Sequence, residues 1–226
     1  MTEVRAAQLW AVIAATRRFA AHAPRTPATA KESPTLYLVS GTSHLAEGWR
    51  DRMPRLELAG DAVLEPAVRA AAATLDLDLV WESPADVIPL PHGWEGRARP
   101  VTESLAQGND LAGLVLRHFD PYSVVLRLVA RGDEPDYVAG LEYVRNGWVD
   151  PKKLEALLDD LLPRFTRATL AQDPAEFRRK FRGLRQLINA IALTGSDAKA
   201  IIAPPPNAAD DAWEARENGW ISSPTS

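Results

Sequence analysis

The sequence contains no cysteine, and this absence excludes disulfide bonds, catalytic thiolates and cysteine-ligated zinc. It also lacks an uninterrupted apolar run of about eighteen residues, the length that a membrane-spanning helix requires. The N-terminal region has no signal-peptide pattern, because Glu3, Arg5 and the pair Arg17-Arg18 interrupt its apolar residues. We therefore expect a cytoplasmic protein that does not bind membranes.

Positive charge is not in excess either. The formal net charge is −4, whereas proteins that bind nucleic acid broadly through their charge are usually basic. Broad nucleic-acid binding is therefore not expected, although a local basic surface is compatible with this composition. Hydrophobic residues make up 46% of the 226 residues, which is typical of a soluble globular protein with a substantial core.

The apolar pattern predicts an α/β (α+β) fold, in which helices flank a mixed sheet and a helical C-terminal half follows. Short β-rich apolar segments indicate strands at 36–39, 56–58, 75–81 and 115–119. Helical spacing and Asp-Pro pairs indicate helices at 3–21, 65–74 and 136–146, and others that start at 120, 150 and 173. We divide the chain into an N-terminal helix and linker (1–35), an α/β core (36–122), a helical portion (123–193) and a tail (194–226) that we expect to be disordered.

A proline-rich stretch from Ser83 to Arg99 lies between two of these strands. Its three prolines exclude a helix interior and a central strand. We interpret Trp94 in this stretch as part of a cover packed on the core, rather than as an aromatic platform for a ligand.

The turn after the first strand is the first candidate for a functional site. Residues 36–39 lead into Ser40-Gly41-Thr42, where glycine permits a tight strand-to-helix turn. Nucleotidyl transfer requires such a turn for the approach of phosphates, together with a metal held by carboxylates on adjacent strands. The sequence Arg55-Leu56-Glu57 stands where an Asp-x-Asp pair would be expected.

Several segments together carry a resemblance to a known family. They are Leu38–Thr42, Gly48–Arg50, Leu77–Leu79, Ser83–Asp86, Ile88–Pro91, Gly93-Trp94, Arg97, Asp120–Tyr122 and Ala130–Gly132. Over roughly residues 36–160 the chain resembles the predicted minimal nucleotidyltransferases, a domain of unknown function distantly similar to abortive-infection and toxin nucleotidyltransferases. The resemblance implies a nucleotidyltransferase-like core followed by helices, Mg²⁺ as the cofactor of an active member, and a role in toxin–antitoxin systems or defence.

The chain departs from the family pattern at its centre. Ser40-Gly41 stands where the family has two glycines, and Arg55 and Glu57 stand where a strand carries two aspartates. An arginine in place of a carboxylate adds positive charge where Mg²⁺ would bind, and it should weaken that binding severely. We therefore predict a nucleotidyltransferase fold with an eroded active site.

The candidate site residues follow from this pattern. The carboxylates proposed for catalysis are Glu57, Asp78 and Asp136, and the first two would hold Mg²⁺ in an active enzyme. The groups proposed for nucleotide binding are Ser40, Gly41, Thr42, Arg50, Arg55 and Arg127, the last beside Leu128, where the family usually has a lysine.

These residues also have simpler interpretations, which stay open. Glu57 and Asp78 are compatible with solvated strand residues. Arg50 and Arg55 are equally compatible with an exposed polar turn. The histidines at 44, 92 and 118 do not have the spacing of metal ligands.

Three functions are compatible with the sequence. The first is a degenerate nucleotidyltransferase that binds a nucleotide or regulates a partner. The second is an active enzyme that transfers a nucleoside monophosphate from an NTP with Mg²⁺. The third is a structural interaction module whose helical half contacts another protein. Arg55 discriminates between the first two, because a cation at the first metal-ligand position disfavours catalysis.

Overall fold

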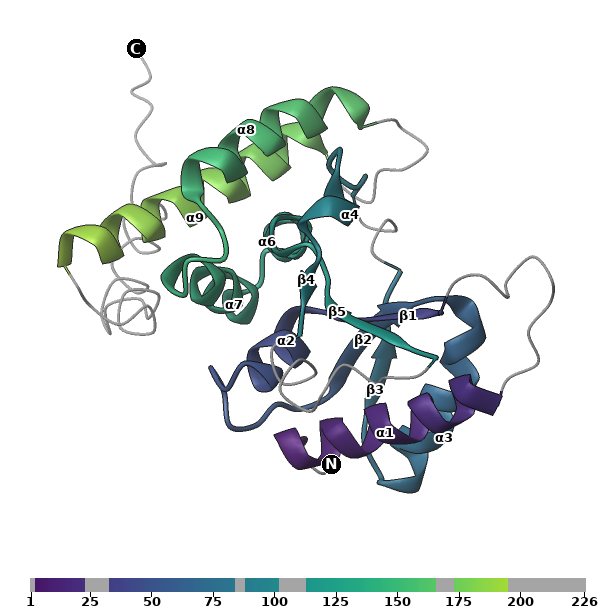
Figure 1. The fold of residues 1–226 in the computed structure, drawn as a ribbon. Helices are drawn as coiled ribbons and strands as arrows, with labels where there is room; N and C mark the ends of the chain where they lie inside the picture. The colour runs from purple at the N-terminus through teal and green to yellow at the C-terminus, as the bar shows by residue number, and fades with distance from the viewer. Residues whose placement is uncertain (1–2, 23–32, 84–87, 102–112, 166–172, 195–226) are drawn as a thin grey trace, which may run out of the picture.

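The computed structural model of the protein describes residues 3–22, 33–83, 88–101, 113–165 and 173–194. Most of the expected linker after the N-terminal helix lies outside the described residues, as does the expected tail beyond residue 194. Within the described residues the fold is mixed α/β, with a sheet in one half and packed helices in the other (Figure 1).

The sheet has five strands in the order β3-β2-β1-β5-β4. They are β1 (Thr35–Leu38), β2 (Leu56–Gly60), β3 (Leu79–Trp81), β4 (Arg99–Pro100) and β5 (Val115–His118). Strand β1 pairs antiparallel with β2 and parallel with β5, while β3 runs parallel to β2. The prediction of a mixed sheet is therefore confirmed, and three segments expected in it, around 36–39, 56–58 and 75–81, all contribute strands.

The third strand is shorter than the sequence predicted. Residues 75–78 do not belong to β3, because α3 (Glu65–Thr74) ends in a turn through Asp76, whose φ is +54°. The first part of the leucine–aspartate alternation, which predicted a strand from Leu75 onward, therefore belongs to this turn.

One face of the sheet is covered by α1 (Ala6–His22) and α3, which lie side by side in Figure 1. Helix α1 contributes Leu9 and Val12 to a fully buried apolar cluster that includes Leu36 of β1 and Val68 of α3. The amphipathic spacing predicted for the N-terminal helix therefore places its apolar stripe against the sheet. The short α2 (Ser40–Ala46) follows β1 in the chain and packs against β2, and the 3₁₀ turn η1 (Ala62–Leu64) leads into α3.

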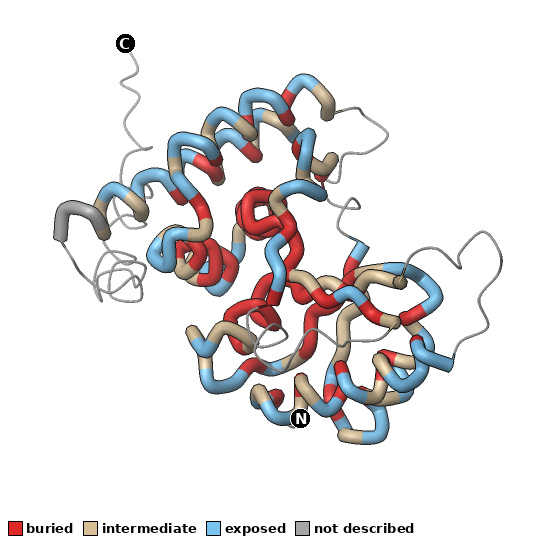
Figure 2. The backbone as a smooth tube through the Cα atoms, in the orientation of Figure 1, coloured by how far each residue is buried: buried red, intermediate tan, exposed pale blue. Residues whose placement is uncertain are grey.

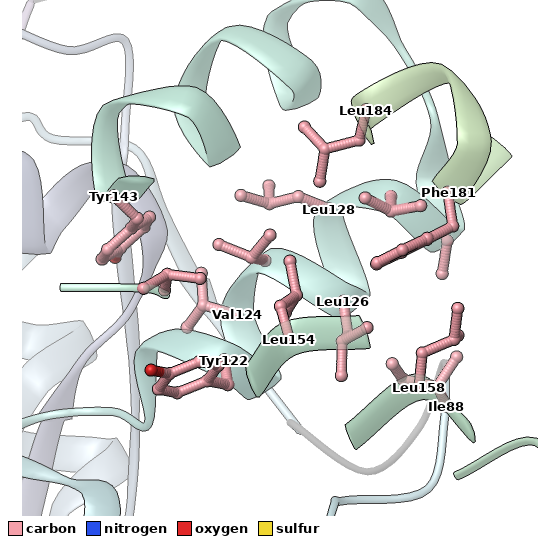
Figure 3. Close-up of a cluster of buried hydrophobic side chains, with 14 of the residues drawn as sticks. Ile88, Tyr122, Val124, Leu126, Leu128, Tyr143, Leu154, Leu158, Phe181 and Leu184 are labelled. Carbon is pink, nitrogen blue, oxygen red and sulfur yellow. The ribbon is translucent and has the colours of Figure 1, made fainter. Parts of the chain in front are cut away.

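The helical half is built around α6 (Pro121–Arg131), almost all of which is buried (Figure 2). It packs against α7 (Glu134–Arg145), α8 (Pro151–Leu161) and α9 (Pro174–Thr194), and a 3₁₀ turn, η2 (Leu162–Arg164), follows α8. Figure 3 shows the apolar cluster between them, with side chains that include Leu126, Leu128, Leu154, Phe181 and Leu184. Helices α6, α8 and α9 each begin at the proline of an Asp-Pro pair, as the sequence predicted.

The proline-rich stretch contributes α4 (Trp94–Arg97) and the edge strand β4, which the sequence did not predict. Trp94 stacks on Phe119 with ring centroids 4.8 Å apart, and its edge meets Tyr37 at 6.0 Å. Trp94 thus packs against the apolar core, which agrees with its interpretation as a cover.

Candidate functional site

A pocket of about 240 Å³ lies between the sheet half and the helical half. Its walls come from α2, the segment before β2, β2 itself, the end of α6 and the start of α7. The lining residues are Ser40, Gly41, Arg50, Met53, Pro54, Arg55, Glu57, Asp78, Arg131, Pro135, Asp136 and Ala139. We call this space the arginine pocket, because three arginines line it.

Most of the candidate site residues meet in the arginine pocket, although they are far apart in the sequence. Ser40, Gly41, Arg50, Arg55, Glu57, Asp78 and Asp136 all line it. Thr42 lies behind the lining, fully buried, where its hydroxyl accepts a hydrogen bond of 2.7 Å from the Glu57 amide. Arg127 does not line it. It pairs instead with Glu82 beside a second, very small cavity that shares Ser40 and Arg131 with the arginine pocket.

Glu57 lies on β2, and Arg55 lies in the segment immediately before that strand. The Arg55 guanidinium contacts Glu57 Oε1 at 3.4 Å through both Nε and Nη2. The other carboxylate oxygen accepts a hydrogen bond from the Gly41 amide at 3.3 Å. Glu57 is therefore a buried carboxylate held by an arginine, and it is not a free surface residue.

Arg131 and Asp136 form a second ion pair at the opposite wall. Arg131 Nη2 donates to Asp136 Oδ1 at 2.6 Å and its Nε donates to Oδ2 at 3.2 Å. Burial lowers the pKa of Arg131, but its hydrogen bond to Asp136 outweighs burial and raises that pKa above its ordinary value. The Arg131 guanidinium is therefore charged at neutral pH. Arg131 was not among the predicted site residues, because only the packing of α7 against α6 places it next to Asp136 in the pocket.

Ser40 is held in a strained backbone conformation at the mouth of the arginine pocket. Its φ is +47°, in the left-handed region that favours glycine. The strand β1 passes into α2 at this residue, and the Tyr143 hydroxyl donates a hydrogen bond of 3.1 Å to the Ser40 carbonyl. A glycine at this position would adopt the turn without strain.

The side chains of the arginine pocket do not fit a Mg²⁺ ion. Magnesium requires oxygen ligands that converge on one octahedral centre. The carboxylates of Glu57 and Asp136 instead face guanidinium groups, and the described part of the chain has no group of three or more His, Asp or Glu placed to hold a metal. The predicted pairing of Glu57 with Asp78 as metal ligands gains no support from this arrangement.

Two buried histidines lie behind the pocket, in an aromatic cluster that the sequence analysis did not identify. His44 is 4.5 Å from the Tyr143 ring and His118 is 4.8 Å from the Trp148 ring, between centroids, and both histidines are fully buried. Burial lowers the pKa of both rings below the ordinary 6.5, and Arg99 adds to the effect on His118. Both rings are therefore neutral at pH 7. A Glu47 oxygen 2.8 Å from His118 Nε2 acts in the opposite direction and limits how far that pKa falls.

These lowered pKa values predict a loss of stability in mild acid. Below pH 6.5 the unfolded chain binds protons at His44 and His118 before the folded chain does, so the free energy of unfolding falls as pH falls. Each ring contributes up to about 1.4 kcal/mol per pH unit. We expect chemical denaturation between pH 7 and 5.5 to show this slope, and His118→Asn to reduce it. A slope unaffected by His118→Asn would contradict the assignment.

Comparison of the chain with protein-family models, with curated proteins and with solved structures finds no match. Within the described residues, no helix is both long enough and apolar enough to cross a membrane.

Proposed function

We propose that this protein binds the phosphate groups of a nucleotide in the arginine pocket without a divalent cation, and that it does not transfer nucleotidyl groups. The observation that carries this proposal is the composition of the pocket: three arginines line it, and two of its carboxylates are already paired with arginine. The planar guanidinium fork matches phosphate oxygens and remains charged at any physiological pH.

Arg55 is the arginine best suited to meet an entering phosphate. Its side chain is 43% exposed, and its contacts with Glu57 are long, at 3.4 Å. Arg131, in contrast, is 30% exposed and has a 2.6 Å contact with Asp136. Arg55 uses Nε and Nη2 for Glu57, so its guanidinium can bring its remaining N–H donors to a phosphate while it stays next to the carboxylate. Arg50 and Arg131 contribute from positions that are already fixed.

The family resemblance supports the same ligand class. In the resembling pattern, a strand, a turn, a short helix and a second strand surround the nucleotide phosphates, and here β1, Ser40-Gly41, α2 and β2 follow in that order. An active Mg²⁺-dependent transferase is the less favoured alternative, because Arg55 faces Glu57 where a second carboxylate would be needed. A role in a toxin–antitoxin or defence system belongs to this proposal as the setting that the resemblance suggests.

A second candidate function is protein binding through the helical half. A groove of about 370 Å³ lies between α8 and α9, with Leu154, Phe181 and Ile188 among its lining residues. Apolar residues on two neighbouring helices are a common basis for helix-in-groove recognition. This function does not compete with nucleotide binding, because the groove shares no lining residue with the arginine pocket.

The substitution Arg55→Asp tests nucleotide binding. We expect calorimetric titration with each of the four NTPs in EDTA to show binding by the unchanged protein, and at least a tenfold loss of affinity in the variant, since it replaces an attractive charge by a repulsive one. The matched control is Arg69→Asp on α3, where Arg69 is 52% exposed and pairs with Glu65 in an i,i+4 contact. Equal affinities of the two variants would contradict the proposed site.

A further inference from the structure

Arg50 differs from the other arginines of the pocket in how it is held. Its Nε donates to both oxygens of Glu142, at 3.1 and 2.9 Å, and its Nη2 donates to Oε1 at 3.0 Å. Its side chain is 31% exposed, and Arg50 lines the pocket. A guanidinium group has five N–H donors, so the two nitrogens that face Glu142 leave Nη1 for a ligand.

Glu142 does not line the arginine pocket, and it comes from a different half of the molecule. It lies on α7, whereas Arg50 follows the end of α2, 92 positions earlier in the chain. Its second neighbour is the fully buried His44, whose Nδ1 is 2.6 Å from Glu142 Oε2, a short contact that is not well directed for a hydrogen bond. The carboxylate is therefore fixed between a histidine from α2 and the arginine that it orients.

The charges around Glu142 keep it ionised. Burial raises the pKa of Glu142, but its interactions with His44 and Arg50 outweigh burial and hold that pKa below its ordinary value. Burial also keeps His44 neutral at pH 7, so Arg50 supplies the positive partner. A charged carboxylate with a bidentate arginine is among the strongest and most directional of protein hydrogen-bond pairs.

We propose that Glu142 is a positioning residue that holds the Arg50 guanidinium ready for a phosphate in the arginine pocket. The inference rests on the proposed function. Immobilising a long side chain at the moment of binding weakens affinity by about three- to tenfold, and the Glu142 contact removes that loss in advance. Glu142 itself does not touch the ligand.

This role makes a prediction opposite to that of a simple charge effect. If Glu142 acted only through its charge, Glu142→Gln would remove a repulsive negative charge and tighten the binding of an anion. If Glu142 positions Arg50, the same substitution loosens the guanidinium and weakens binding by about three- to tenfold. Glu155 of α8, whose side chain is 46% exposed and pairs with Arg185 of α9, gives the matched control Glu155→Gln.

The decisive experiment is a double-mutant cycle read by calorimetric titration with ATP in EDTA. We expect Glu142→Gln to weaken binding in the unchanged protein and to have no further effect in the Arg50→Ala background, while Glu155→Gln has no effect in either. A purely structural role would give the same loss in both backgrounds, and this result would overturn the inference, as would tighter binding by Glu142→Gln.

Thermal unfolding of each variant verifies that it is folded at the titration temperature. If Glu142→Gln is unfolded at that temperature, Glu142→Asp, which keeps the charge, replaces it in the cycle, with the same expected loss of affinity. If the unchanged protein binds no ATP, the proposed function fails together with the inference, whereas binding without the predicted coupling removes the inference alone.

Discussion

Purified protein incubated with radiolabelled NTPs and Mg²⁺ or Mn²⁺ is expected to show no nucleotidyl transfer. The reason is the positive charge of Arg55 at the position where the resembling pattern would have its first metal ligand. Replacing a carboxylate by Arg55 changes the local charge by two units, and each unit-charge interaction at about 4 Å is worth roughly 4 kcal/mol at an effective dielectric near 20. Arg55 also contacts the remaining carboxylate, Glu57. Even strongly screened, this effect is large compared with usual differences in metal affinity.

The double variant Ser40→Gly, Arg55→Asp distinguishes an eroded site from a site that never bound metal. Arg55→Asp supplies the missing carboxylate next to Glu57, and Ser40→Gly removes the strain of a serine at φ +47°. Transfer that appears only in the double variant would support erosion from an active enzyme. Inactivity of both proteins would favour a site that never bound metal, and robust transfer by the unchanged protein would contradict the proposed function.

The substitution Asp120→Ala is expected to destabilise the fold by about 3–5 kcal/mol. Asp120 is fully buried and is the N-cap of α6, where it accepts a hydrogen bond from the Tyr122 amide at 3.2 Å. Its carboxylate also accepts three hydrogen bonds from Arg97, at 2.7 to 3.1 Å, and one from the Ser123 hydroxyl at 2.7 Å. Removing the carboxylate leaves the guanidinium of Arg97, whose side chain is only 15% exposed, without its partner.

The matched control for this substitution is Asp150→Ala. Asp150 is also the N-cap of a helix that starts with an Asp-Pro pair, and it accepts a hydrogen bond from the Lys153 amide at 2.8 Å. It is exposed, so its loss should cost only the roughly 1 kcal/mol of an ordinary cap. Denaturant unfolding of the two variants measures the difference. Equal losses would show that the Arg97–Asp120 pair adds nothing beyond capping.

The parts of the fold that the sequence predicted are those governed by local rules. Asp-Pro starts, the apolar spacing of α1 and the β-rich segment around Leu36 each depend on neighbouring residues, and all three correspond to elements of the structure. Strand β4 and helix α4 were not predicted, because their positions depend on contacts with β5 and Phe119 that lie far away in the sequence. Strand β3 is shorter than predicted, because a turn at Asp76 includes residues whose alternation of leucine and aspartate had predicted a strand.

The candidate site shows the same division between local and distant causes. Arg55 and Glu57 were selected because they stand where an Asp-x-Asp pair would be expected, and both line the pocket. Arg131 and Glu142 could not be predicted from the sequence. Only the packing between the two halves places Arg131 in the pocket wall and Glu142 next to Arg50. Arg127 was predicted to bind a nucleotide because it stands beside the position where the resembling family usually has a lysine. In the structure, its position on α6 places it next to Glu82, with which it pairs.

The metal dependence of nucleotide affinity tests the central claim most directly. Calorimetric titration of the unchanged protein with each NTP should be done twice, once in EDTA and once with excess Mg²⁺. The proposed function predicts binding in EDTA that Mg²⁺ does not strengthen, because the arginines of the pocket supply the positive charge and Mg²⁺ masks the phosphates that they would contact. Binding that occurs only with Mg²⁺ would contradict it.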